Sequence, residues 1–194
     1  MTTSRYNIEK YLQSFSLLTA DEIKTLISKM RPRTIKKGEY FIREGQICRE
    51  VAYIESGFFR SFYLNTEGKE TTYCFLFANT LVTAYSSFIT QEKTIENIQA
   101  LADTEILAIS KQDIERMEQS SANFLRLTKI LAEQEYLLME RRVIQLLQES
   151  AENRYKDLLH NQPAYLQTIP LNYLASYLGV TPRHLSRIRK AISI

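Results

Sequence analysis

Glycine and proline are placed unevenly along this chain of 194 residues, and their positions divide it into parts with different folding tendencies. Four of the five glycines lie between positions 38 and 68, at intervals of seven, twelve and eleven residues. From Lys111 to His160 the chain contains neither glycine nor proline. Glycine permits the positive φ angles of tight turns, and both residues interrupt helices. We therefore expect short strands joined by turns first, followed by a long helical region.

Short runs rich in aromatic and β-branched residues lie between the clustered glycines and continue beyond them. They occupy residues 39–42, 51–55, 58–65, 69–77, 95–101 and 105–109. Runs of this kind at near-even spacing are typical of a small barrel or sandwich. Before them, residues 5–30 repeat apolar side chains at helical spacing, with Thr19 and Glu22 placed to form a capping box. The Arg31-Pro32 pair is expected to end this helical segment.

The glycine-free stretch repeats apolar residues every seven positions, at Ile130, Leu137, Ile144 and Ala151. A small barrel alone cannot cover so long an apolar stripe. We therefore expect residues 120–150 to pair with the same helix of a second subunit, with Leu131 and Leu138 in the seam. The alternative is an ordinary core helix with a break near Ser150.

Residues 169–192 carry the strongest functional signal. Gly179 can adopt the left-handed conformation that ends a helix. Thr181 then fits an N-cap and Pro182 the first position of a second helix. This order is the plan of a helix-turn-helix, whose second helix presents its first residues to the major groove of DNA. The first helix of the pair has four residues spaced to line one face: Leu171, Leu174, Ala175 and Leu178.

The second helix of this segment has a basic outward face, and no acidic residue follows Asp157. Arginine donates two parallel hydrogen bonds to guanine, so Arg183 and Arg187 are candidates for reading base edges. Hydroxyl and cationic groups suit phosphate oxygens, which fix position without reading sequence. The predicted DNA-binding residues are Thr181, Arg183, His184, Ser186, Arg187, Arg189 and Lys190. The alternative is a helical hairpin whose basic face is only solvated.

The order of strands, long helix and terminal helix-turn-helix resembles the Crp/Fnr superfamily of bacterial regulators. Residues 38–70 and 100–110 are similar to the family's first and closing strands, and residues 174–190 to the truncated helix-turn-helix of members in the Bacteroidetes. The resemblance implies an α+β chain: an N-terminal β jelly roll of the cyclic-nucleotide-binding type over 1–116, a long dimerisation helix over 117–150, and a small α helix-turn-helix domain over 151–194. It implies double-stranded DNA and a second copy of the chain as partners, and it adds RNA polymerase and an unidentified small-molecule effector.

The chain departs from this family in its phosphate-binding cassette. Members that bind cyclic AMP carry a Gly-Glu pair and, ten residues after the glutamate, an arginine followed by serine or threonine. Counting back from the closing strand places these positions on Ala84, Thr94 and Ile95. A cyclic phosphate would lose its strongest hydrogen bonds there, and Lys93, one position away, lacks the bidentate fork. We therefore expect no cyclic AMP binding of the usual kind.

Two further expectations follow from this alignment. A pocket for a different effector is predicted from five residues: Tyr73, Phe75, Tyr85, Ser87 and Thr94. Many relatives continue into a β-hairpin wing, whereas this sequence stops at Ile194, so wing contacts with DNA are expected to be absent or replaced.

Other classes of protein fit the sequence poorly. The two histidines, His160 and His184, lie outside the predicted barrel, so a metal-using jelly-roll enzyme would lack ligands there. There is no phosphate-binding glycine loop and no nucleophile elbow. Cys48 and Cys74 are interpreted as reduced thiols, and no secretion signal or membrane span is recognised. We therefore expect a cytoplasmic regulator that is not an enzyme and has no cofactor, the alternative being a ligand-sensing or protein-interaction module with a vestigial helix-turn-helix.

Overall fold

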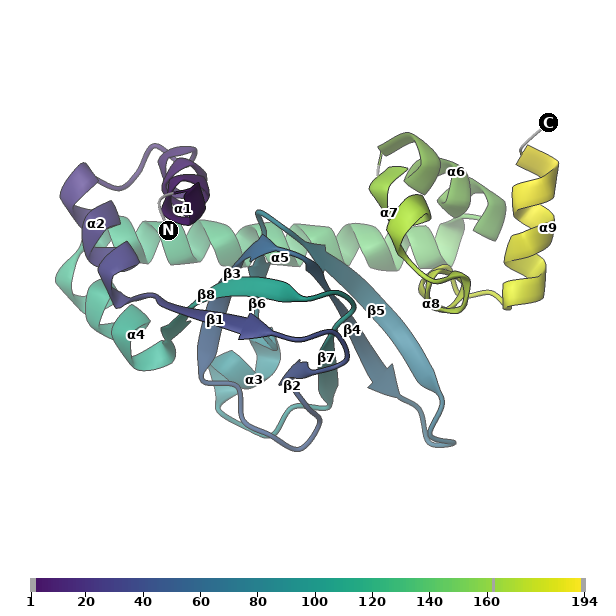
Figure 1. The fold of residues 1–194 in the computed structure, drawn as a ribbon, viewed down its shortest axis with the longest axis horizontal. Helices are drawn as coiled ribbons and strands as arrows, with labels where there is room; N and C mark the ends of the chain where they lie inside the picture. Colours follow the sequence, from purple (N-terminus) through teal and green to yellow (C-terminus); the bar gives the residue numbers. More distant parts are fainter. Residues whose placement is uncertain (1–2, 162, 193–194) are drawn as a thin grey trace. The chain divides into compact units, whose positions relative to one another are not determined.

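The computed structural model describes residues 3–161 and 163–192 of the chain (Figure 1). These residues form two compact units. The first unit holds the residues up to Tyr63 together with Cys74–Ala132. The second holds Leu64–Tyr73 and the residues from Glu133 onward. Among the helices in these ranges, none is long and apolar enough to cross a membrane.

The N-terminal segment forms two helices, α1 (Thr3–Gln13) and α2 (Ala20–Lys29), rather than one. The predicted capping box is confirmed, because the Glu22 amide donates to Thr19 Oγ1 at 3.2 Å and the Thr19 amide donates to Glu22 Oε2 at 2.8 Å. Glu22 also accepts hydrogen bonds from Ser121 and Asn123. The bond from Ser121, then those from Thr19 and Asn123, lowers the pKa of the Glu22 carboxyl to about 2. Helix α2 ends before Arg31, as the sequence predicted.

The strands of the described residues form two four-stranded sheets with antiparallel pairing. One sheet has the order β1-β8-β3-β6 and the other β2-β7-β4-β5. The strands are β1 (Arg31–Ile35), β2 (Tyr40–Ile42), β3 (Glu50–Ser56), β4 (Phe58–Leu64), β5 (Glu70–Phe77), β6 (Leu81–Val82), β7 (Glu96–Ala100) and β8 (Thr104–Ser110). The sequence did not predict β1, which contains Pro32. Proline is tolerated there because β1 is an edge strand.

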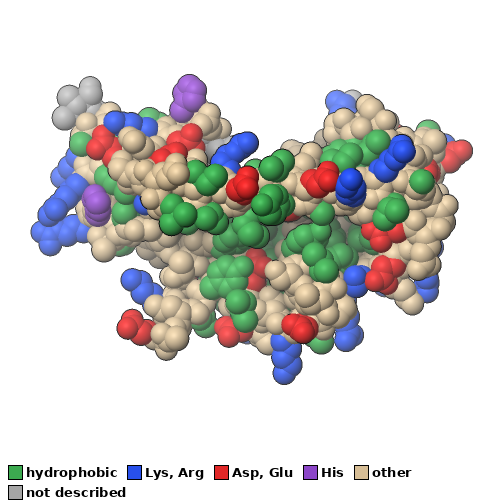
Figure 2. All heavy atoms as spheres, turned by 180° about the vertical axis from the view of Figure 1, so that it is seen from behind, with side chains coloured by type: hydrophobic (Ala, Val, Ile, Leu, Met, Phe, Trp, Pro, Cys, Tyr) green, Lys and Arg blue, Asp and Glu red, His purple; other side chains and the backbone are tan. Residues whose placement is uncertain are grey.

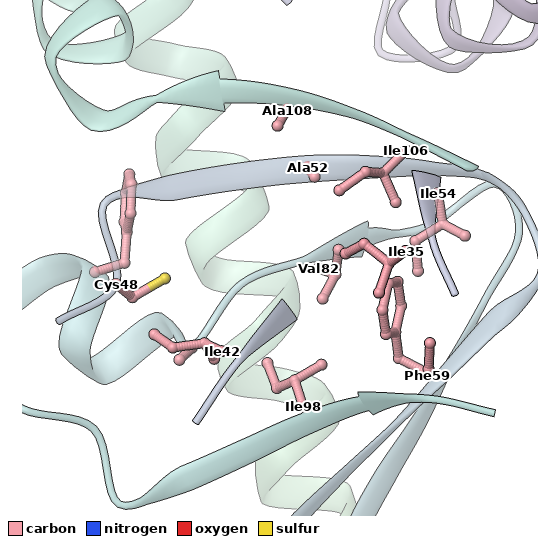
Figure 3. Close-up of a cluster of buried hydrophobic side chains, with 13 residues drawn as sticks. Ile35, Ile42, Cys48, Ala52, Ile54, Phe59, Val82, Ile98, Ile106 and Ala108 are labelled. Atoms are coloured by element: carbon pink, nitrogen blue, oxygen red, sulfur yellow. The ribbon is translucent and has the colours of Figure 1, made fainter. Parts of the chain in front are cut away.

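The core of the jelly roll consists of alternate residues from both sheets (Figure 3). The sheet of β1, β3, β6 and β8 contributes Ile35, Ala52, Ile54, Val82, Ile106 and Ala108. The other sheet contributes Ile42, Phe59, Ile98 and Ala100. Side chains at every second position of a strand share a face, so this alternation follows from the pleat. The interior between the two sheets is therefore packed with aliphatic and aromatic side chains.

A second apolar cluster covers the other face of the β1-β8-β3-β6 sheet. Tyr53 of β3 and Leu107 of β8 pack there against Ile8 and Leu12 of α1, Ile23 of α2, and Leu127 of α5 (Ala122–Gln148). Leu131 is packed against this same cluster. Its side chain therefore already has neighbours within its own unit and is only partly available to a second subunit, so its place in an intersubunit seam stays a prediction.

The glycine-free stretch forms three helices in place of one: α4 (Lys111–Ser120), α5 (Ala122–Gln148) and α6 (Ala151–Asn161). Serine hydroxyls stabilise the breaks. Ser121 has an extended backbone, and its hydroxyl accepts from the amide of Asn123, while Ser150 accepts from the amide of Asn153. Serine at such positions substitutes for the missing intrahelical bonds at a helix start. After α6 come α7 (Pro163–Thr168), α8 (Leu171–Tyr177) and α9 (Pro182–Ile192).

Gly57, between β3 and β4, is the glycine whose replacement should disturb this fold most. Its φ is +80°, and an added Cβ would lie 2.6 Å from the carbonyl oxygen of Asp103 and 2.7 Å from Cα of Thr104. We expect Gly57→Ala to lower the free energy of unfolding by about 3 kcal/mol or more, because backbone strain and a backbone clash add. Gly38→Ala is the matched control, since Gly38 has φ +88° and open space around it. In urea unfolding, this control should lower the free energy of unfolding by only about 1 kcal/mol. Equal losses of stability in the two variants would contradict the close approach of Gly57 to Asp103 and Thr104.

Candidate nucleic-acid interface and sensor barrel

The turn between α8 and α9 has the hydrogen bonding of a Schellman motif. Gly179 has φ +71° and its amide donates to the carbonyl of Ser176 at 3.1 Å. The amide of Val180 donates to the carbonyl of Ala175 at 2.9 Å. Glycine is favoured here because a side chain at positive φ is strained. The turn therefore ends α8 and starts α9 within a few residues.

Helix α9 begins as the sequence predicted. The amide of His184 donates to Thr181 Oγ1 at 3.2 Å, so Thr181 is the N-cap, and Pro182 is the first helical residue. Leu185 and Ile188 of α9 are buried. The buried residues of α8 are Leu174 and Ala175, followed by the buried Leu178. The apolar side of α9 is thus buried, and its other side is accessible to solvent or a ligand.

The outward side of α9 carries Arg183, His184, Arg187 and Lys190, and all four side chains are exposed. Blue Lys and Arg side chains gather over α9 at the left edge of Figure 2. Thr181 is also exposed, although its hydroxyl oxygen already serves as the N-cap. These five predicted residues are therefore all accessible, from the N-cap of α9 to its last turn.

Ser186 and Arg189 lie differently from the other predicted DNA-binding residues. Both are half-buried. The Ser186 hydroxyl donates to the carbonyl of Pro182 at 3.0 Å, within α9. The Arg189 guanidinium lies over the ring of Tyr155 at 5.9 Å from its centroid, and Arg189 Nε is buried. These contacts give both side chains a role in packing α9.

Two arginines that the sequence did not single out contact the same turn. Arg142 of α5 donates to the carbonyl of Tyr177, and Arg154 of α6 donates to the carbonyl of Leu178 at 2.8 Å. No spacing rule would have identified them, because a lone arginine in a predicted helix is most often a solvated side chain.

The predicted effector residues do not form a set of free polar groups. Phe75 is buried and Tyr85 is exposed, while Tyr73 belongs to the second compact unit and the other four to the first. The buried Ser87 hydroxyl accepts from the Cys48 amide at 2.9 Å and donates to the carbonyl of Glu92. The buried Thr94 hydroxyl accepts from the amide of Glu96 at 2.9 Å. Ser87 and Thr94 therefore hold the loops around α3 (Tyr85–Thr90) in place.

The aligned phosphate-binding positions lie around α3 and the start of β7. Ala84 is buried and precedes α3, which has no side-chain cap at this end. Ile95 is 70% exposed. Glu96 lies on the same face of β7 as the core residue Ile98, and the fully buried Ser61 donates a hydrogen bond to its carboxylate. The side chains at the three aligned positions thus include no cation.

The comparisons with known proteins bear on both units. Residues 32–121 match a protein-family model described as "Cyclic nucleotide-binding domain". This span runs from β1 to the end of α4 and so includes both sheets. Comparison with curated protein sequences gives no match.

Three similar solved structures cover most of the chain. A protein assigned to the Crp/Fnr family of transcriptional regulators, from Eubacterium rectale, is 20% identical with a TM-score of 0.73, and 95% of this chain and 88% of that chain are covered. FixK2 from Bradyrhizobium japonicum is 16% identical with a TM-score of 0.74 and 84% of each chain covered. The c-di-GMP-responsive global regulator CLP from Xanthomonas campestris is 15% identical with a TM-score of 0.71, over 90% of this chain and 92% of that chain. The chain has the fold of the Crp/Fnr regulators.

The fold that the resemblance to the Crp/Fnr superfamily implied is thereby confirmed: the α+β class with its N-terminal jelly roll. The family model ends at residue 121, before α5 begins. The likeness of α5 to α9 to this fold therefore rests on the solved structures, which cover 84–95% of the chain. At 15–20% identity these structures establish the fold, and the function has to be argued from the site.

Proposed function

We propose that this protein is a sequence-specific DNA-binding transcription regulator of the Crp/Fnr type that acts as a homodimer. The observation that carries the proposal is the exposed side of α9, where Arg183, His184, Arg187 and Lys190 are accessible while Leu185 and Ile188 are buried. A helix that is fixed by packing on one side and basic on the other fits the major groove. RNA polymerase remains a predicted partner of a regulator of this kind.

We assign different roles to the exposed cations of α9. Arg183 and Arg187 lie one helical turn apart near the start of the helix, where side chains reach base edges. Lys190 lies further along and suits a phosphate, as do Thr181 and His184. The sequence also predicted that Ser186 and Arg189 contact the DNA backbone. Their contacts to Pro182 and Tyr155 favour a role in packing α9 instead.

Replacing either Arg183 or Arg187 with alanine should cost about 1–3 kcal/mol on the best operator and relax the preference at one or two base pairs. Lys190→Ala should instead weaken binding to all sequences similarly and reduce the salt slope by about one unit. Binding-site selection followed by fluorescence anisotropy over a salt series measures both effects. The selected operator should be a near-palindrome with half-sites about 34 Å apart. Identical enriched motifs from the wild type and the Arg183→Ala, Arg187→Ala variant would mean that α9 does not read DNA.

The proposal of a dimer rests on the apolar surface of α5. Hydrophobic side chains run along this helix in the middle of Figure 2. Leu137 and Ile144, which are seven residues apart, are 55% and 46% exposed, and Leu147 is 79% exposed. Such a surface on one helix is a typical seam for a second copy. Leu138 is exposed as well, in contrast to Leu131.

Leu137→Asp and Ile144→Asp should each shift the protein toward monomer. Each places an uncompensated charge where apolar surface has to close, which costs about 3 kcal/mol or more and weakens association at least a hundredfold. Sedimentation equilibrium at tens of micromolar protein measures the change. Ile89→Asp is the control, because the exposed fraction of Ile89 equals that of Leu137, 55%, but Ile89 lies on α3. A wild type that stays monomeric on concentration would refute the dimer.

We further propose that the sensor barrel does not take cyclic AMP or cyclic GMP as its effector. Ala84, Thr94 and Ile95 offer no guanidinium, and the Thr94 hydroxyl already accepts from the main-chain amide of Glu96. The barrel is proposed to bind another small molecule, less anionic than a cyclic nucleotide.

Titration calorimetry should find no binding of cyclic AMP or cyclic GMP tighter than about 1 mM. Adenosine is the matched control, since it has the same base and ribose without the phosphate. Because a phosphate finds no cationic partner at the aligned positions, adenosine should bind no more weakly than cyclic AMP. A micromolar constant for either cyclic nucleotide would overturn this part of the proposal.

A further inference from the structure

The end of helix α8 leaves two carbonyl groups that its own turn cannot satisfy. The last four carbonyls of any α-helix lack intrahelical donors. Here the Schellman motif supplies amides to Ala175 and Ser176. The carbonyls of Tyr177 and Leu178 receive no amide from that motif, and their donors are arginine side chains of other helices.

Arg142 of α5 supplies a donor to the first of these carbonyls. Its Nη2 donates to the oxygen of Tyr177. The same guanidinium lies over the Tyr177 ring, 3.9 Å from the centroid, and the side chain is half-buried. A cation over an aromatic ring adds attraction that a plain hydrogen bond lacks. Arg142 therefore holds both the main chain and the side chain of Tyr177 against α5.

Arg154 of α6 supplies a donor to the second carbonyl and also reaches the end of α5. Its Nη2 donates to Leu178 O at 2.8 Å, and its Nη1 donates to the carbonyls of Glu149 and of Gln145, the latter at 3.4 Å. The C-terminal ends of helices carry partial negative charge. One guanidinium therefore neutralises the ends of two helices, α5 and α8, and joins them. Lysine could not do this, because it lacks a planar fork with several donors.

We infer that Arg142 and Arg154 form an arginine clamp that fixes the helix-turn-helix to the C-terminal half of α5 and so determines the spacing of operator half-sites. The inference rests on the proposed function, since spacing matters only if a dimer binds DNA. The same part of α5 carries Leu137 and Ile144 of the proposed seam. The separation of the two α9 helices in a dimer is therefore fixed by how α8 is attached to α5. Neither arginine belongs to the exposed face of α9, so both are positioning residues.

The test compares half-site spacing in Arg142→Gln, Arg154→Gln and the double variant with the wild type. Each protein is titrated with the selected operator, with operators lengthened or shortened by one base pair between half-sites, and with a single half-site. The wild type should prefer its own spacing by about tenfold or more, and the clamp variants should reduce this preference to about twofold. Affinity for the single half-site and the salt slope should stay close to wild type, because no DNA contact is removed. Lys156→Gln is the control, since Lys156 lies on α6 two residues after Arg154 and forms an ion pair with the exposed Glu152 at 2.7 Å.

A second measurement needs no DNA. Amide hydrogen exchange at Gly179 and Val180 should become at least about tenfold faster in each clamp variant, because the turn is no longer held from two sides. If the double variant does not fold by circular dichroism, the single variants decide. Clamp variants that keep the wild-type spacing preference and exchange rates would overturn the inference. A wild type that binds no DNA would instead refute the proposed function, and the exchange rates would still report on the clamp.

Discussion

Helix α5 is continuous, but its two halves belong to different compact units and have different neighbours. Its first turns bury Phe124 and Leu127 in the unit that contains the jelly roll. Its later turns belong to the second unit, where Arg142 contacts the turn of the helix-turn-helix and Leu137 and Ile144 remain exposed. Apolar side chains with no cover in the monomer are costly to leave in water. The proposed dimer would cover these side chains, while Arg142 joins the same part of α5 to the turn between α8 and α9.

The packing of the jelly roll and its ligand chemistry depend on different residues. Its interior is filled by residues such as Ile54, Phe59 and Ile98, whose packing needs no ligand. Around α3, the hydroxyls of Ser87 and Thr94 bond main-chain groups. A match to a cyclic nucleotide-binding domain therefore describes the sheets and their connections. The ligand depends on a few side chains that the same sheets can carry in other forms.

Much of the fold could be predicted from the sequence because local rules were decisive there. Thr19 with Glu22, Gly179, and Thr181 with Pro182 mark helix ends through interactions within a few residues. The strands around the clustered glycines follow from residue type and turn spacing. Prediction was weaker where a contact joins distant segments. The break at Ser121 depends in part on Glu22, which is 99 positions away, and Leu131 is partly buried in a cluster that α1 and α2 form with the sheet.

Among the arginines of the candidate site, too, those marked by local sequence signals could be predicted, and those with distant partners could not. Arg183 and Arg187 could be identified from the sequence because they follow a recognisable helix start and face outward at helical spacing. Arg142 and Arg154 could not, since their partners are carbonyl oxygens, which every residue possesses and which no sequence pattern marks. Arg189 lies between these cases, because it belongs to α9 but packs on Tyr155. Positive charge near the C-terminus is therefore a poor measure of DNA contact by itself. The useful distinction is whether a guanidinium already has main-chain or aromatic partners inside the protein, because a group satisfied there has fewer donors to offer a phosphate or a base.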